Sequence, residues 1–351
     1  MNQNSIVKIK NGIVLPLTNA NLGGVCDSEF NFIQESKFDG WSSKGGFYSV
    51  DTSVCHKHER VLYLGFFIQH WGHFLIECLG RVWILQNPEY KDYKIVFLRK
   101  GGTFEKQHCQ FFELLGKDKD SFVNVDEPTS FDEIVVPSVA YLETDPDLFY
   151  IPFRMAVEQC RFYDGAPSKV YFSRTHLKKA KKTELGEKYI ERKFKDAGFA
   201  ICYPEEMSLR EQIEIFQRSE HVVCINGTIP LNACLFAGPQ LNLTVLNKTS
   251  LPHDVLVRVS KLVPIKLLYI DIFFEPICGF PVTFGAGPFW MRFNTNLINY
   301  FRDNHWPCDV SVFYKLSFVM SFPVYVMMCG YVFFNRVLKC KIKKILKGSF
   351  K

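Results

Sequence analysis

The chain has 351 residues, 47% hydrophobic and 22% charged, which allows two ordinary globular domains and excludes a disordered protein. Residues 335–351 contain seven Lys or Arg and no acid, so without them the net charge falls from +6 to −1, which argues against a nucleic-acid-binding body. The twelve cysteines are scattered and residues 1–12 lack the apolar core of a signal peptide, so we expect a cytosolic body with reduced, buried thiols.

Residues 61–85 are the first stretch with a functional pattern. His73, Glu77 and Arg81 are four residues apart, so a helix would place them in one polar stripe. His73 or Glu77 is therefore a candidate general base, since a neighbouring carboxylate keeps an imidazole basic. Two alternatives stay open: a buried Glu77–Arg81 ion pair with His73 capping the helix, or a metal site of His70, His73 and Glu77.

Residues 94–139 alternate short apolar runs with one helical pattern, so the amino-terminal half is also predicted to be α/β. The D-x-D strings at residues 118–120 and 145–147 are of the kind that holds a divalent ion on a diphosphate. Among 36 acidic residues such strings arise easily by chance, so we expect no metal. Residues 164–168 break the pattern and are the predicted linker.

Residues 170–246 repeat a strand-then-helix unit, which is typical of a parallel sheet flanked by helices. Ligands bind at the carboxyl ends of such strands, where helix N–H groups point. The polar residues that follow three of the strands are Arg174, Glu205, and Asn226 with Gly227 and Thr228. An arginine can bind a phosphate through two hydrogen bonds, and a carboxylate can accept from ribose hydroxyls. The sequence therefore predicts a nucleoside diphosphate site.

Two smaller patterns support this arrangement of helices. Ser208 and Glu211 form a capping box, which predicts a helix that begins just after Glu206. Thr228 and Pro230 are typical of a helix amino terminus, where a diphosphate would gain from free N–H groups and the helix dipole.

Residues 316–334 contain no charge and, as a helix, would extend about 28 Å, close to the thickness of a bilayer core. The basic residues 335–351 follow directly. An apolar run with a cationic end predicts peripheral or single-span association with the inner face of the cell membrane. The alternative is a core helix that returns across both domains.

Residues 169–246 contain, in a characteristic order and spacing, Tyr171, Phe172, Ser173, Arg174, Gly198, Pro204, Glu205, Ser208, Glu211, Gln212, Phe216, Gly227, Asn232 and Phe236. With these residues the block resembles glycosyltransferase family 61, which includes bacterial capsular-polysaccharide transferases. The helix that carries His73, Glu77 and Arg81 is similar to a second motif of that family. One position departs, because many members carry a histidine where this chain has Asn226, and asparagine cannot be protonated.

The resemblance implies two Rossmann-like domains that face a cleft (the GT-B type), an inverting outcome and no cofactor besides a nucleotide-sugar donor, which we expect to be UDP-linked. It adds Lys178, four residues after Arg174, and Asn232 to the donor site, although Asn232 could instead close a buried cap. The acceptor would be a polysaccharide or a lipid-linked glycan. The predicted segments are an acceptor-side domain (1–164), a donor domain (165–275), returning helices (276–315) and a membrane-association segment (316–351).

Two other classes of protein stay open on the sequence. One is a metal-dependent transferase or a nucleotide-sugar epimerase, because both use the same kind of sheet and substrate. The other is a non-catalytic, membrane-bound component of a polysaccharide assembly complex, since Asn226 replaces the expected histidine.

Overall fold

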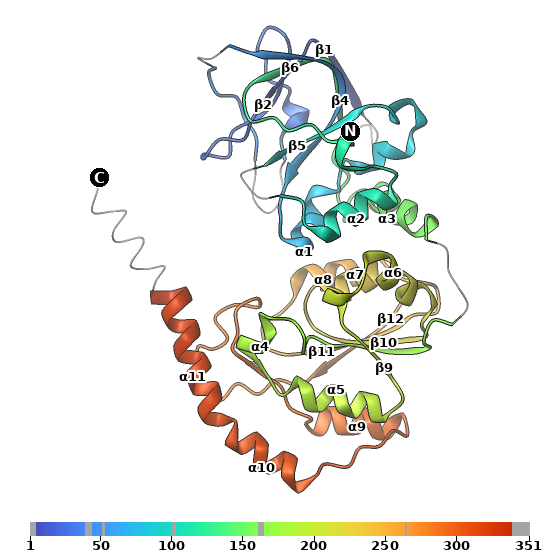
Figure 1. Ribbon diagram of the computed structural model, residues 1–351, viewed down its shortest axis with the longest axis vertical. Helices are drawn as coiled ribbons and strands as arrows, with labels where there is room; N and C mark the ends of the chain where they lie inside the picture. Colours follow the sequence, from blue (N-terminus) through green and yellow to red (C-terminus); the bar gives the residue numbers. More distant parts are fainter. Residues whose placement is uncertain are drawn as a thin grey trace. The chain divides into compact units, whose positions relative to one another are not determined.

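The computed structural model describes residues 5–38, 44–50, 53–99, 103–160, 165–263 and 265–338. The chain divides into two compact units, residues 1–161 and 162–351, each with its own sheet (Figure 1). The α/β class predicted from the sequence is confirmed. Asp164 of the predicted linker and the tail from residue 339 onward lie outside the described residues.

Unit 1 contains a mixed six-stranded sheet in the order β3-β2-β6-β4-β5, with β1 also paired to β6. β4 runs parallel to β5 and β6, whereas β1, β2 and β3 join by antiparallel pairs. The parallel, Rossmann-like arrangement that the sequence predicted is therefore found only in β4, β5 and β6, and not in β1, β2 and β3. The strands are β1 (Ile6–Lys10), β2 (Ile13–Leu15), β3 (Gly24–Cys26), β4 (Cys55–Phe67), β5 (Lys94–Arg99) and β6 (Thr129–Pro137).

The helices of unit 1 are short, and phenylalanine rings fill the space between them and the sheet. Phe74, Phe111 and Phe112 are buried and pack edge to face with their neighbours, an arrangement that aromatic rings favour. The elements are η1 (Gln34–Ser36), α1 (Trp71–His73), η2 (Phe74–Cys78), η3 (Val82–Gln86), η4 (Pro88–Tyr90), α2 (Lys106–Leu114), η5 (Lys119–Ser121) and α3 (Pro146–Glu158).

Unit 2 is built on a five-stranded, fully parallel sheet in the order β9-β7-β10-β11-β12. Counted along the chain this order is 2-1-3-4-5, a doubly wound sheet whose connections reverse direction between its first and third strands. The strands are β7 (Lys169–Phe172), β9 (Ala200–Cys202), β10 (His221–Ile225), β11 (Asn242–Asn247) and β12 (Lys266–Asp271).

Helices cover both faces of this sheet, as Figure 1 shows: α5 and α9 on one face, and α6, α7 and α8 on the other. Phe194 of α5 and Phe301 of α9 pack together over Tyr171 of β7. The capping box of Ser208 and Glu211 is confirmed. The elements are α4 (Ala180–Thr183), α5 (Glu187–Asp196), η6 (Pro204–Glu206), α6 (Leu209–Arg218), α7 (Ile229–Leu235), α8 (Asp254–Ser260) and α9 (Thr295–Asp303).

The carboxy-terminal helices α10 (Val312–Met320) and α11 (Phe322–Val332) continue into η7 (Phe333–Leu338). One side of them rests on Trp290 of the two-stranded sheet β8 (Glu184–Leu185) and β13 (Phe289–Trp290), with Phe318 stacked at 4.5 Å. The other side exposes large apolar side chains, including Phe313, Met320 and Met327. These helices are therefore not the core helices that the sequence left as an alternative.

The cysteines of the described residues are free, and six of them are buried. Cys55, Cys109 and Cys278 are exposed, so the expectation of buried thiols holds only in part.

Candidate functional site

The strands β7 and β10 lie side by side at the point where the connections of unit 2 reverse, which is where doubly wound sheets bind ligands. Arg174 follows β7 and Gly227 follows β10. A side chain on Gly227 would lie 3.4 Å from Nη1 of Arg174, so the guanidinium sits directly against the glycine turn. The structure thus brings together two predicted residues that are 53 positions apart in the sequence.

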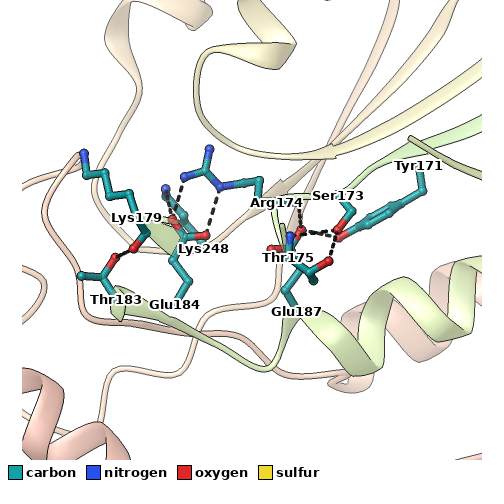
Figure 2. Close-up of polar contacts among 9 residues, drawn as sticks. All are labelled: Tyr171, Ser173, Arg174, Thr175, Lys179, Thr183, Glu184, Glu187 and Lys248. Carbon is teal, nitrogen blue, oxygen red and sulfur yellow. Dashed lines mark hydrogen bonds and ion pairs between the residues drawn. The ribbon is translucent and has the colours of Figure 1, made fainter. Parts of the chain in front are cut away.

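Figure 2 shows that the side chains of Arg174 and Lys248 both contact the carboxylate of Glu184. Arg174 donates from Nε and Nη2 to the Glu184 carboxylate at 3.0 and 2.8 Å, and Lys248 Nζ donates to the same carboxylate at 3.3 Å. Both Glu184 and Lys248 are buried, with side chains 4% and 5% exposed. Since Nε and Nη2 are occupied by Glu184, Nη1 is the edge of Arg174 that faces Gly227.

The charges of Arg174, Glu184 and Lys248 shift the pKa values of the neighbouring groups. Burial by itself raises the pKa of Glu184, but Lys248 and Arg174 outweigh it and lower that pKa to about 2. Burial lowers the pKa of Lys248 to about 8, against the opposing effect of Glu184. One carboxylate therefore lies between two cations, so Arg174, Glu184 and Lys248 together carry a net positive charge at neutral pH.

Glu187 fixes the backbone of the same turn. Its Oε1 accepts hydrogen bonds from the Arg174 N–H at 2.7 Å and from the Tyr171 hydroxyl at 3.2 Å. Burial is the main cause that raises the pKa of Glu187 to about 7, and the charge of Glu184 adds to it. We call Arg174, Glu184, Glu187 and Lys248 the Arg174 cluster.

Gly186 makes the spacing of these two carboxylates possible. It has φ +93°, and a Cβ there would lie 1.9 Å from the carbonyl oxygen of Met291, so only glycine fits. The chain therefore turns between Glu184 in β8 and Glu187 at the start of α5, and both carboxylates reach Arg174.

The turn after β10 does not present all of its predicted ligands in the same way. Asn226 is buried, and its amide donates to Asn247 at 2.8 Å and contacts Nδ1 of His253 at 2.9 Å. Thr228 precedes α7 without a capping side-chain bond. Asn232 is buried and its amide lies 3.5 Å from Gln212 of α6, which favours the alternative of an amide that closes a buried contact.

Glu205 and Lys178 are exposed at the rim of the same edge. The charge of Glu205 is among those that raise the pKa of Arg174, so this carboxylate lies near the guanidinium, although burial opposes the shift. Glu206 pairs with His176, which stacks on Tyr203 at 3.7 Å. No contact joins Lys178 to Arg174 among the hydrogen bonds and ion pairs of the described chain.

In unit 1, Nδ1 of His73 forms a hydrogen bond with the carboxylate of Glu77. The His73 side chain is 35% exposed and that of Glu77 is 10% exposed. The second carboxylate oxygen of Glu77 is buried and, within the described residues, has no hydrogen-bond partner. An imidazole oriented by a carboxylate is the arrangement expected of a general base.

Arg81 does not extend this stripe, which corrects the predicted continuous helix. The helix α1–η2 stops at Cys78, and Arg81 is buried and donates to the carbonyl oxygens of Glu35, Lys37 and Pro137. Gly65 leaves space for its guanidinium, since a Cβ there would lie 2.7 Å from Nη1. The Glu77–Arg81 ion pair is therefore wrong, and Arg81 ties loops of unit 1 together.

Within the part of the chain that the structure describes, one group has the ligand spacing of a metal site: His56, His58 and Asp132, all exposed. The predicted D-x-D string at 118–120 has a local structural role, because Asp118 accepts from the backbone N–H and the hydroxyl of Ser121 at 3.0 and 2.9 Å.

The family model of glycosyltransferase 61 matches residues 71–244 of this chain. This stretch, just under half of the chain, is similar to glycosyltransferase family 61. The matched stretch begins two residues before His73 and ends within β11, so it includes the His73–Glu77 pair, Arg174, Glu184, Glu187 and Gly227. No curated protein matches the chain significantly.

Four residues of this region are not among those predicted from the sequence: Glu184, Glu187, Lys248 and His253. Gly186 was the available signal for the first two, because a glycine between two acids just before a helix indicates a special backbone turn. Lys248 and His253 follow β11, at the same sheet edge as Arg174, so the rule that ligands bind at the carboxyl ends of parallel strands was the available signal for them.

Proposed function

We propose that this protein is an inverting, metal-independent glycosyltransferase. It would move a sugar from a nucleotide-sugar donor, UDP-linked, to a hydroxyl of a growing capsular or other surface polysaccharide. The observation that carries this proposal is the position of Arg174 Nη1 against Gly227, at the reversal point of a doubly wound parallel sheet. The match to glycosyltransferase 61 supports the class of reaction.

On the donor side, Arg174 would bind the diphosphate through Nη1, with the N–H groups of the Gly227–Thr228 turn beside it. Lys178 and Glu205 would contact the donor at the exposed rim, and Asn226 and Asn232 would shape the pocket floor. As the bond between the anomeric carbon and the diphosphate breaks, the positive Arg174 cluster would stabilise the charge that develops on the leaving group. Because Glu184 already holds the guanidinium, little reorganisation is needed.

On the acceptor side, the His73–Glu77 pair would take the proton of the attacking hydroxyl. The acceptor oxygen then bonds to the anomeric carbon on the face opposite the diphosphate, which inverts the configuration, and the diphosphate departs with the electron pair. Bringing this pair to the donor requires the two units to face a common cleft, the GT-B arrangement.

The helices α10 and α11 support a membrane-facing position for unit 2. Among the described residues, one helix, Val312–Asn335, is long and apolar enough by its 24-residue length and its composition to cross a membrane. Because one side of this helix packs on Trp290 and the other is exposed, we infer that it lies in the bilayer interface, on the cytoplasmic face. The basic sequence that follows it would add attraction for anionic lipid. Deletion of residues 316–351 should release the protein from the membrane fraction; unchanged partition would refute this.

A thermal-shift screen of nucleoside diphosphates and nucleotide sugars tests the donor site. A ligand that binds only the folded protein at 100 times its Kd adds about 2.7 kcal/mol of stability. We expect a shift with one nucleotide series, and its loss in Arg174→Ala, but not in Arg210→Ala, a matched control on the exposed surface of α6. Absence of any shift in the wild-type protein would refute the proposed donor site.

A further inference from the structure

Four polar side chains form a continuous chain along the carboxyl edge of β10, β11 and β12. Asn247 donates from Nδ2 to the Asp271 carboxylate at 2.8 Å, and Asn226 donates from Nδ2 to Oδ1 of Asn247 at 2.8 Å. Nδ1 of His253 then lies 2.9 Å from Oδ1 of Asn226. The carboxylate at one end is therefore connected to an imidazole at the other by two amides.

The carboxylate determines the direction of every bond in this chain. A carboxylate accepts but does not donate, so Asn247 must present its NH2 group to Asp271 and its oxygen to Asn226. Asn226 must then present its NH2 group to Asn247 and its oxygen to His253. The remaining donor is His253, whose proton must be on Nδ1, and so Nε2 carries a lone pair. The opposite orientation would place two oxygens 2.8 Å apart at Asp271.

The ring of His253 is fixed in place and stays neutral. It stacks on Phe284, with ring centroids 4.5 Å apart and planes at 22°. Burial is the main cause that lowers the pKa of His253 to about 4; the positive charge of Lys248 acts in the same direction and Asp254 acts against it. Nε2 has no hydrogen-bond partner among the described residues. The chain thus presents one oriented acceptor that no other group of the described protein uses.

His253 lies beside the same turn as Arg174. Its partner Asn226 directly precedes Gly227, and Gly227 lies against Nη1 of Arg174. Lys248 is close enough to act on both His253 and Glu184. Cations suit the phosphates of a nucleotide sugar, whereas a neutral nitrogen acceptor suits its hydroxyl groups, which are donors.

We propose that His253 binds a hydroxyl group of the nucleotide sugar through Nε2, and that Asp271 positions this acceptor through Asn247 and Asn226. The proposal rests on the proposed function, since it names a further contact in the same donor site. The hydroxyl belongs to the ribose or to the transferred sugar. His253 therefore acts as a binding residue, and Asp271, Asn247 and Asn226 as positioning residues.

The tautomer can be measured without any ligand. Full-length protein labelled with 15N-histidine contains nine histidines, and comparison with His253→Gln assigns the ring of interest. We expect a protonated Nδ1 and an unprotonated Nε2 in the wild type at pH 7. In Asp271→Asn the end of the chain can also donate, so the opposite tautomer should become populated, whereas Asp254→Asn should change nothing. A wild-type His253 protonated on Nε2 overturns the proposal.

Binding supplies the second test. We expect His253→Phe, which keeps the stacking on Phe284 but lacks Nε2, to weaken the nucleotide sugar about fivefold, the size of one neutral hydrogen bond. Equal weakening of the nucleoside diphosphate assigns the contact to the ribose, and weakening of the nucleotide sugar only assigns it to the transferred sugar.

The outcomes separate the two proposals. If the wild type binds a nucleotide sugar and His253→Phe binds it equally well, the role of His253 is refuted while the donor site stands. If the wild type binds neither ligand, both the donor site and the contact of His253 are refuted.

Discussion

The His73–Glu77 pair of unit 1 and the Arg174 cluster of unit 2 use the same kinds of side chains in opposite ways. His73 is a third exposed, and Glu77 keeps one carboxylate oxygen without a partner in the described chain. In the Arg174 cluster the carboxylate of Glu184 is buried and shared between two cations. The His73–Glu77 pair thus keeps a carboxylate oxygen without a hydrogen bond in the described chain, whereas the carboxylate of Glu184 is bonded to both of its neighbouring cations.

This difference fits the two tasks that we propose for these regions. A group that exchanges a proton must reach its substrate, so an orienting carboxylate and partial exposure suit it. A group that stabilises charge works best when it is already oriented and desolvated, because nothing then has to reorganise during the reaction. We therefore expect substitutions in the first region to change catalysis, and substitutions in the second to change stability as well.

The largest effect is expected from His73→Ala. Removal of a general base should lower kcat by about 10²–10⁴-fold, with little change in thermal midpoint because the side chain is partly exposed. The assay is transfer from the donor identified by thermal shift. His56→Ala, an exposed histidine of the same unit, is the matched control and should keep wild-type activity. A His73→Ala enzyme with full activity would remove His73 from the mechanism.

Glu184→Gln should cause the largest loss of stability. It removes the charge of the carboxylate that pairs with both Arg174 and Lys248, and loss of one partner costs about 3–5 kcal/mol in comparable buried pairs. The measurement is urea unfolding of the full-length protein, which gives the free energy of unfolding and the midpoint. Glu206→Gln is the matched control, because its partner His176 is exposed and such surface pairs contribute about 0–1 kcal/mol. Equal midpoints for the two variants would contradict a structural role of Glu184.

Glu187 should make stability fall as pH rises from about 4.5 to 7. Burial raises its folded-state pKa from the ordinary value of 4.5 to about 7, so the folded protein holds a proton that the unfolded chain releases in this window. The loss is on the order of 3 kcal/mol. Glu184 titrates below this window and Lys248 above it.

Glu187→Gln isolates that contribution, because glutamine stays neutral and its oxygen still accepts from the Arg174 N–H and Tyr171. Unfolding midpoints between pH 5 and 8 should decline less in this variant than in the wild type. A decline of the same steepness in both proteins would assign the pH dependence to other groups.

The smallest effect is expected from Lys178→Ala. The side chain is exposed, so its attraction for a diphosphate is screened, and donor affinity should fall less than about fivefold at low salt. The difference in donor affinity between Lys178→Ala and the wild type should disappear at high salt, so the titrations are done at both low and high salt. Lys188→Ala, an exposed lysine of α5, should leave affinity unchanged. A loss as large as that of Arg174→Ala would move Lys178 into the centre of the site.

Local pattern was enough to predict the parallel sheet of unit 2 and the helix start at Ser208, because both follow from short-range periodicity and capping. The proximity of Arg174 and Gly227 followed from the rule that carboxyl ends of parallel strands share an edge. The antiparallel half of unit 1 was missed, since residues 6–26 show no regular alternation between their glycine turns.

Side-chain partners were the hardest feature to predict. The four-residue spacing of Glu77 and Arg81 suggested an ion pair, but the helix ends between them and Arg81 binds distant carbonyl groups. Glu184 reaches Arg174 only because Gly186 adopts a positive φ, a property of the folded backbone. Asn226 was read as a ligand contact, whereas its bonds to Asn247 and His253 depend on the order of three strands.

The small sheet of β8 and β13 joins two parts of unit 2 that otherwise have separate tasks. Glu184 pairs with Phe289 on one rung, and Leu185 pairs with Trp290 on the next, where Trp290 stacks against Phe318 of α10. A displacement of α10 would thus reach the residue that holds Arg174. If binding of α10 to a bilayer changed the affinity of the proposed donor site for a nucleotide, thermodynamic reciprocity would require the nucleotide to change the affinity for lipid vesicles by the same factor.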